Sequence, residues 1–251
     1  MTRTRRFSRG GKLPGNDKSA SLILGVFIFL GLSVLGYLLA SAAIEFKQYE
    51  RSVTVKGLSE REYHADIVIW PIQFTAASNN LETLYSSIEQ STTKIEAFLI
   101  DNGIELQAIS ASSPAITDKS AQQYGNNARA EFRYTATQTV TVYSGNIEAV
   151  RAVMSQLSQL GKQGIAFTGG NYQSRTEYVF TRLNEVKPDM IEEATTKARE
   201  VAEKFSADSK SKLGKIKRAS QGQFSINDRD NNNPHIKKVR VVTTVEYYLS
   251  D

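Results

Sequence analysis

The longest uninterrupted run of hydrophobic positions lies near the beginning of the chain. Residues 20–44 read ASLILGVFIFLGLSVLGYLLASAAI and hold no charged side chain. About 20 residues cross a hydrocarbon core of ~30 Å at ~1.5 Å per residue. A core helix of a globular protein turns one polar face to water, and this run has none. The pattern therefore predicts a transmembrane helix over Ala20 to Ile44.

After this run the pattern changes to short alternations and helical stripes. Alternation is clearest at 131–143, where apolar residues take turns with threonines, which is typical of a half-buried strand. Stripes with a 3.6-residue period predict three helices. The first follows Asn79-Asn80, the second runs from Asn146 to Leu160, and the third has Pro188 near its first turn. The predicted strands are 51–58, 65–75, 105–116, 131–143, 165–182, 215–226 and 236–249.

Glycine, proline and polar clusters predict where these elements turn or end. Gly57 with Ser59-Glu60 indicates a hairpin turn, and Pro71 indicates a bulge or an unpaired strand edge. Asn102-Gly103, Gly161 and Gly214 are placed to end the three helices. Gly169-Gly170 predicts a bend, and residues 117–129 read as an exposed loop.

The order ββαββαβαββ predicts the fold class. We expect α+β architecture, with an N-terminal transmembrane helix followed by a domain of mostly antiparallel sheet and three helices that cover one side. The chain then divides into a basic cytoplasmic tail (1–19), the transmembrane helix (20–44), a stalk (45–50) and an exported α/β domain (51–251).

The distribution of charge sets the orientation of the predicted anchor. Residues 1–19 hold six basic residues and one acidic residue, and the rest of the chain balances 25 against 25. The positive-inside rule therefore places the amino terminus in the cytoplasm and the domain outside the cytoplasmic membrane. The alternative is a signal peptide cleaved after Ala42, because Ala40-Ser41-Ala42 has the small-x-small form of a cleavage site.

Composition excludes several classes of function. The chain has no cysteine, which rules out disulfides, thiolate metal ligands and cysteine nucleophiles. The domain is neutral overall, so it has no net attraction for phosphate backbones, and we expect no nucleic-acid partner.

Few residues suggest chemistry. His64 and Asp66 could form an acid/base pair on one strand, and His235 is the second histidine, but no zinc-site spacing is present. The stretch 161–170 (GKQGIAFTGG) lacks the Gly-Lys-Ser/Thr ending of a phosphate loop. Glu192-Glu193 belongs to a charged helix face, where solvation is the ordinary role. We therefore expect no catalytic, cofactor-binding or metal-binding residue.

Short motifs in the predicted domain carry a family resemblance. They are the strand Val53-Thr54-Val55-Lys56-Gly57, then Ala65-Asp66, Asn102-Gly103-Ile104, the alanine-rich helix from Ala194 to Ala202, and Lys212-Leu213-Gly214. In their order and spacing the chain resembles the SIMPL-domain family of bacterial envelope proteins, over about residues 51–249. The resemblance implies an α/β domain, an exported location and self-association, and it implies no catalytic residue or cofactor. This sequence differs from many relatives in its long apolar segment.

These observations lead to two functional hypotheses. The first is a non-enzymatic, membrane-anchored envelope protein that forms homo-oligomers and supports envelope integrity or oxidative stress tolerance. The threonine face of 131–143 or a Tyr247-Tyr248 edge would offer a surface for subunit pairing by strand addition. The second is a module that binds a small ligand or a partner envelope protein in a groove between helices and sheet near Trp70.

Overall fold

The structure is a computed structural model that describes residues 17–49, 51–121, 131–169 and 174–250. Most of the predicted basic tail, residue 50 of the predicted stalk, most of the loop predicted at 117–129, and Gly170 lie outside the described residues. The chain divides into two compact units. The smaller comprises Met1–Thr54, Ala202–Arg218 and Glu246–Asp251, and the larger comprises Val55–Val201 and Ala219–Val245.

The first element is the helix α1 (Asp17–Tyr49). Its stretch Ser21–Ile44, 24 residues, is long and apolar enough to cross a membrane, and all of its side chains are exposed. The helix continues through residues 45–49, which the sequence pattern assigns to a stalk.

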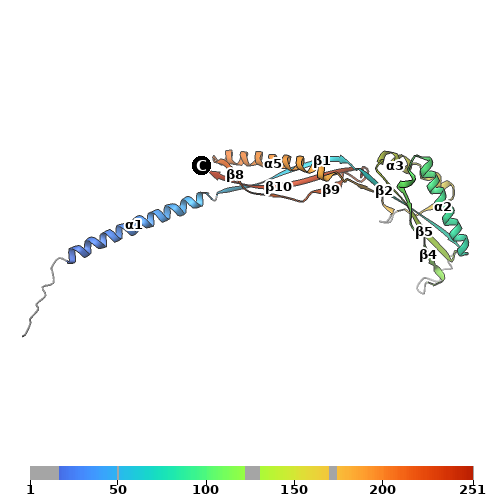
Figure 1. Ribbon diagram of the computed structural model, residues 1–251, viewed down its shortest axis with the longest axis horizontal. Helices are drawn as coiled ribbons and strands as arrows, with labels where there is room; N and C mark the ends of the chain where they lie inside the picture. The colour runs from blue at the N-terminus through green and yellow to red at the C-terminus, as the bar shows by residue number, and fades with distance from the viewer. Residues whose placement is uncertain (1–16, 50, 122–130, 170–173, 251) are drawn as a thin grey trace, which may run out of the picture. The chain divides into compact units, whose positions relative to one another are not determined.

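The remaining elements follow the predicted order (Figure 1). The predicted strands 105–116, 165–182 and 215–226 are each divided into two strands, and the second predicted helix is divided into two helices. The strands are β1 (Ser52–His64), β2 (Ile67–Ser78), β3 (Ile109–Ala111), β4 (Ala115–Asp118), β5 (Tyr134–Ser144), β6 (Ala166–Phe167), β7 (Glu177–Val179), β8 (Lys212–Gln221), β9 (Ser225–Asp228) and β10 (Ile236–Ser250). The helices are α2 (Leu81–Asp101), α3 (Ile147–Met154), α4 (Ser158–Lys162) and α5 (Leu183–Asp208), with short 3-10 turns at Leu106–Ala108 and Lys119–Ala121. The α+β prediction is confirmed.

Within the larger unit, six strands form one sheet in the order β3-β5-β2-β6, with β4 paired to β5 and β7 paired to β2. All of these pairings are antiparallel. One face of the sheet supports α2 and α3 and holds the main core, because alternate residues of β2 and β5 point to the same side. The strand residues of this core are Val68, Trp70, Ile72, Phe74, Ala136, Val140 and Val142.

Pro71 lies where the second edge of β2 is interrupted. On that edge β7 pairs with Ile67–Ile69 and β6 pairs with Phe74 and Thr75. Pro71 falls between them and is opposite Thr141 on the other edge. The missing N–H of the proline therefore removes no hydrogen bond from the strand pairs that the structure describes. The prediction of an unpaired edge at Pro71 is confirmed.

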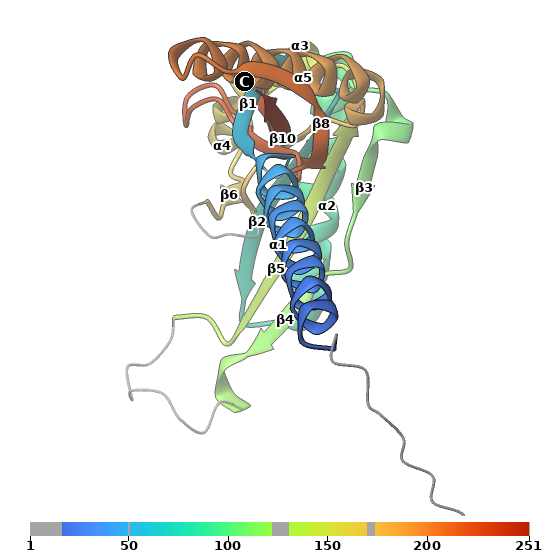
Figure 2. The same cartoon turned by 90° about the vertical axis from the view of Figure 1, so that its left-hand side faces the viewer.

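A second sheet has the order β1-β10-β8, and β9 also pairs with β10. In the larger unit, α5 lies along one face of this sheet (Figure 2). Met190 and Ala194 of α5 pack there with Val239 and Val241 of β10. The single sheet predicted from the element order is therefore two sheets.

The predicted hairpin turn at Gly57 is wrong, because β1 continues without a break to His64. A Cβ atom at Gly57 would lie 2.5 Å from the backbone nitrogen of Ala198 and closer still to the carbonyl oxygen of Ala194. The glycine is thus a point of close approach between β1 and α5, and this use does not require a turn.

Two predicted helix ends are also wrong. The second predicted helix breaks after Met154 and resumes as α4, which passes through Gly161 and ends before Gly164, where φ is +87°. The third helix ends at Asp208, and Gly214 belongs to β8, where a Cβ would lie 3.1 Å from the Tyr248 side chain. Asn80 and Gly103 bound α2 as predicted, with the Asn80 Oδ1 atom accepting from the Thr83 N–H at 3.1 Å.

In the smaller unit, the ends of β1, β8 and β10 are joined by polar contacts. The Glu246 carboxylate accepts hydrogen bonds from the Ser52 hydroxyl at 2.5 Å and from the Lys217 ammonium at 3.1 Å. The Leu249 N–H donates to the Arg51 carbonyl at 2.9 Å. These bonds lower the pKa of Glu246, with the Ser52 bond the largest cause.

Candidate functional site

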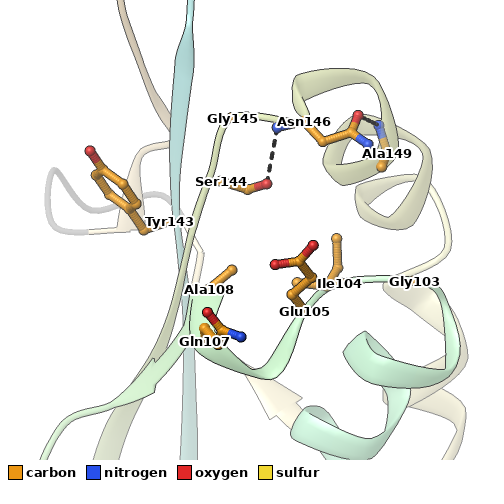
Figure 3. A pocket seen from close by; sticks show the side chains of 10 residues that line it. All are labelled: Gly103, Ile104, Glu105, Gln107, Ala108, Tyr143, Ser144, Gly145, Asn146 and Ala149. Carbon is orange, nitrogen blue, oxygen red and sulfur yellow. Dashed lines mark hydrogen bonds between the residues drawn. The ribbon is translucent and has the colours of Figure 1, made fainter.

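A cavity of about 340 Å³ lies in the larger unit, where the last turn of α2, the end of β5 and the first turn of α3 meet (Figure 3). Local turn chemistry frames it on both sides. Gly103 takes the left-handed conformation that lets the chain leave α2. Asn146 caps α3 by accepting from the Ala149 N–H at 3.1 Å, and the Ser144 hydroxyl accepts from the Asn146 N–H at 3.1 Å.

Small and polar groups line the cavity. They are Gly103, Ile104, Glu105, Gln107, Ala108, Tyr143, Ser144, Gly145, Asn146 and Ala149. The Glu105 carboxylate points toward Ser144, whereas the Tyr143 ring lies on the opposite side of β5 (Figure 3). The volume falls within the ~300–1,000 Å³ of small-ligand pockets. A single carboxylate among hydrogen-bonding groups suits a small cationic ligand. It does not supply the nucleophile with an adjacent general base that covalent catalysis requires.

The second feature is the face of the six-stranded sheet opposite to α2 and α3, which we call the open face. The register places threonines of β5 directly beside Pro71, Gln73 and Thr75 of β2. None of its side chains is buried, and Glu177 is its only charged residue. The open face comprises Ile67, Ile69, Pro71, Gln73, Thr75, Ala77, Ser110, Ala115, Thr117, Thr135, Thr137, Thr139, Thr141, Tyr143, Ala166, Glu177 and Val179.

The structure gives Asp66 a different role from the predicted acid/base pair with His64. The Asp66 carboxylate accepts hydrogen bonds from the Thr181 N–H at 2.6 Å, the Thr181 hydroxyl at 3.1 Å and the Arg182 side chain at 2.6 Å. Burial raises the pKa of Asp66, but these bonds outweigh it and hold the pKa below its ordinary value. Asp66 therefore anchors the segment after β7, and it stays ionised at neutral pH. His64 ends β1 and lies near His235.

Glu192 and Glu193 have separate roles. Glu192 is exposed, as predicted. The Glu193 carboxylate instead accepts hydrogen bonds from the Ser59 hydroxyl and the Arg61 side chain of β1, each at 2.9 Å, and from Lys197 at 2.5 Å. These bonds, with the one from Lys197 the largest cause, lower the pKa of Glu193 to about 2. Glu193 thus joins α5 to β1 and borders a shallow charged hollow of about 430 Å³ along the helix.

The other predicted regions contain no site. The stretch 161–169 runs through the end of α4 and β6. Trp70 is buried within the main core, so the groove expected beside it is filled by packing. Tyr247-Tyr248 lies on β10, and the threonine row lies on β5. Both strands are central in their sheets, so neither offers the free edge that strand addition needs.

The cavity was not found from the sequence. Glu105 precedes, and Gln107 belongs to, a 3-10 turn that the pattern assigns to a strand, and no spacing marks them as neighbours of Ser144 and Asn146. The helix cap at Asn146 and the helix end at Gly103 were the available signals, because they fix two of the three walls.

Comparison with known proteins gives one finding. Residues 53–246 match the sequence profile of the SIMPL family, which is described as a protein of unknown function (DUF541). No curated protein matches the chain.

Proposed function

This chain belongs to the SIMPL family, and we propose that it is a non-enzymatic, single-pass membrane protein of the bacterial envelope that self-associates through its domain. In this proposal the amino terminus is cytoplasmic, the domain lies in the periplasm or outside the cell, and the assembly supports envelope integrity or oxidative stress tolerance. The observation that carries the proposal is α1, in which a predominantly apolar stretch of 24 residues, Ser21–Ile44, is exposed.

The physical chemistry of α1 supports a membrane anchor. In water, an exposed and predominantly apolar stretch of 24 residues would be strongly unfavourable, whereas at ~1.5 Å per residue it spans about 36 Å, which exceeds the ~30 Å of a hydrocarbon core. The helix has no other helix packed against it to bury these side chains, among the described residues. The excess of basic residues before the helix favours a cytoplasmic amino terminus.

Fractionation of cells that express the intact protein tests the anchor and the orientation. We expect the full-length chain to resist carbonate extraction, and an epitope placed after Asp251 to be digested in spheroplasts but not in intact cells of a two-membrane bacterium. A shorter soluble product would support cleavage after Ala42. Protection of the epitope in spheroplasts would contradict the proposed orientation.

The open face supports self-association. It is nearly uncharged and rich in β-branched residues, and its strands run up to 12 residues. Two such faces pack well against each other, because sheets stack at ~10 Å with their side chains interdigitated. A second copy of the chain is therefore the partner that we propose, and it meets the first through this face instead of a sheet edge.

Charge placed on the open face tests this arrangement. The double variant Thr137→Lys, Thr139→Lys should convert oligomers of the detergent-solubilised protein to monomers in sedimentation velocity, because paired faces would bury four ammonium groups per dimer. Thr93→Lys, at an exposed position of α2, is the matched control and should leave the assembly unchanged. A monomeric wild-type protein at high concentration would contradict self-association.

The lack of an enzymatic activity is also part of the proposal. Among the described residues, no group of three or more His, Asp or Glu side chains is placed to hold a metal ion. The carboxylates of Asp66 and Glu193, both candidates from the sequence, are occupied by structural hydrogen bonds.

A second candidate function is favoured by the cavity beside Glu105. A module that binds a small ammonium compound would use the Glu105 carboxylate as the counter-ion. Choline and putrescine are suitable probes in a thermal-shift titration, and Glu105→Gln should abolish any stabilisation that they cause. Glu177→Gln, an exposed carboxylate on the open face, is the control. Equal responses of wild type and Glu105→Gln would remove this candidate.

A further inference from the structure

The fold brings together the only two histidines of the chain, which are far apart in the sequence. Their ring centroids are 6.3 Å apart, with an angle of 40° between the ring planes. The backbone fixes this proximity, because the Ala65 N–H donates to the carbonyl oxygen of His235 at 2.9 Å. The end of β1 is therefore held against the residue that precedes β10.

The His235 side chain has an incomplete set of partners. The residue is 7% exposed, and its Nδ1 atom is buried without a hydrogen-bond partner among the described residues. A buried polar atom without a partner is unfavourable, so the structure leaves a donor or acceptor position for something else. The Tyr178 ring packs edge-on against His235 with the centroids 6.0 Å apart, which holds the imidazole in place.

We propose that His64 and His235 together bind one copper(I) ion. A metal ion lies about 2 Å from an imidazole nitrogen, so two rings that share one ion in a nearly linear arrangement have centroids about 6 to 6.5 Å apart. The observed separation is 6.3 Å. His64 is an exposed side chain at the end of β1, so a rotation of its ring can turn a nitrogen toward the ion.

Coordination number favours copper(I) over divalent ions. Copper(I) is stable with two nitrogen donors in line, whereas zinc in proteins takes three or four protein ligands. Burial is the main cause that lowers the pKa of His235, and Arg151 adds to it against the opposite effect of Glu148.

The test uses the full-length protein in detergent, purified through a tag without histidine. Copper(I), kept reduced by ascorbate under nitrogen, is titrated in competition with the chromogenic chelator bicinchoninate. The absence of cysteine keeps thiolate binding out of the measurement. We expect one ion per chain, and the imidazole C–H resonances of both histidines should shift together in the proton NMR spectrum.

Variants separate this site from others. His64→Ala removes one ligand at an exposed position and should weaken binding by more than about 100-fold, since loss of second-shell partners alone costs 10- to 100-fold. Lys56→Ala, on the same face of β1, is the control and should bind as wild type. Unchanged affinity in His64→Ala, or zinc(II) binding with equal stoichiometry and higher affinity at the same residues, would overturn the proposal.

Discussion

Substitution of Gly57 by alanine tests whether β1 and α5 pack as the structure has them. A Cβ atom there would lie 2.5 Å from the Ala198 nitrogen and 2.9 Å from the carbonyl carbon of Ala194. Real Cβ atoms essentially never come within 3.0 Å of such neighbours. All the colliding atoms belong to the helix backbone, so no side-chain rotation relieves the overlap and α5 must move away from the sheet.

The expected loss of stability follows from this geometry. Overpacking by a single methyl group costs ~1–3 kcal/mol where side chains adjust, and more where they cannot. We therefore expect about 3 kcal/mol or more for Gly57→Ala. At 2–4 °C per kcal/mol for a protein of this size, the midpoint of thermal unfolding should fall by about 6–12 °C. Far-UV circular dichroism of the full-length protein in one fixed detergent measures it.

Gly161→Ala is the matched control, because it adds the same methyl group inside α4 with no atom within 4 Å of the new Cβ. Alanine is favoured over glycine in a helix by ~1 kcal/mol, so this variant should be as stable as wild type or slightly more stable. If the midpoint of Gly57→Ala lies within about 2 °C of the control, the close approach of β1 to α5 is wrong.

Three further substitutions test other contacts. Glu193→Gln should lower the free energy of unfolding at neutral pH, because the pKa of Glu193 is depressed to about 2 in the folded state. The difference from wild type should persist above the ordinary pKa of 4.5 and shrink as pH falls toward 2. Urea titrations at several pH values measure this difference. Asp66→Ala removes the acceptor of the hydrogen bonds from Thr181 and Arg182 and should cost about 3 kcal/mol in urea unfolding; a loss below about 0.5 kcal/mol would contradict the anchoring role. Asn80→Ala removes the cap of α2 and should cost about 1 kcal/mol, whereas Asn80→Ser should retain most of that stability.

The order of elements was predictable because it depends on local periodicity. The alternation at 131–143 and the stripe from Leu81 to Leu99 each mark which side of an element is apolar, and both became the core sides of β5 and α2. Asn80 and Gly103 were found for the same reason, since a cap and a left-handed helix end are made by neighbours in the chain. Local signals of this kind need no knowledge of the partner element.

Features that depend on distant partners were not predictable. Gly57 has the residue type of a turn, and only the position of α5 shows that its missing side chain serves packing. Glu193 resembles any exposed helix carboxylate until β1 supplies Ser59 and Arg61. The proximity of His64 and His235 likewise depends on the pairing of Ala65 with His235, which no pattern along the chain encodes.

The structure also explains why two of the family motifs occur in one chain. The motif of β1 that ends in Lys56-Gly57 and the alanine-rich motif of α5 that begins at Ala194 are far apart in the sequence, yet they form two sides of one contact. Small residues on both sides let a helix backbone approach a strand directly, so each motif is useful only when the other is present. These two motifs therefore identify a way of packing. A specific activity of this chain should be sought at positions outside them, and Glu105, the open face and the histidine pair all meet that condition.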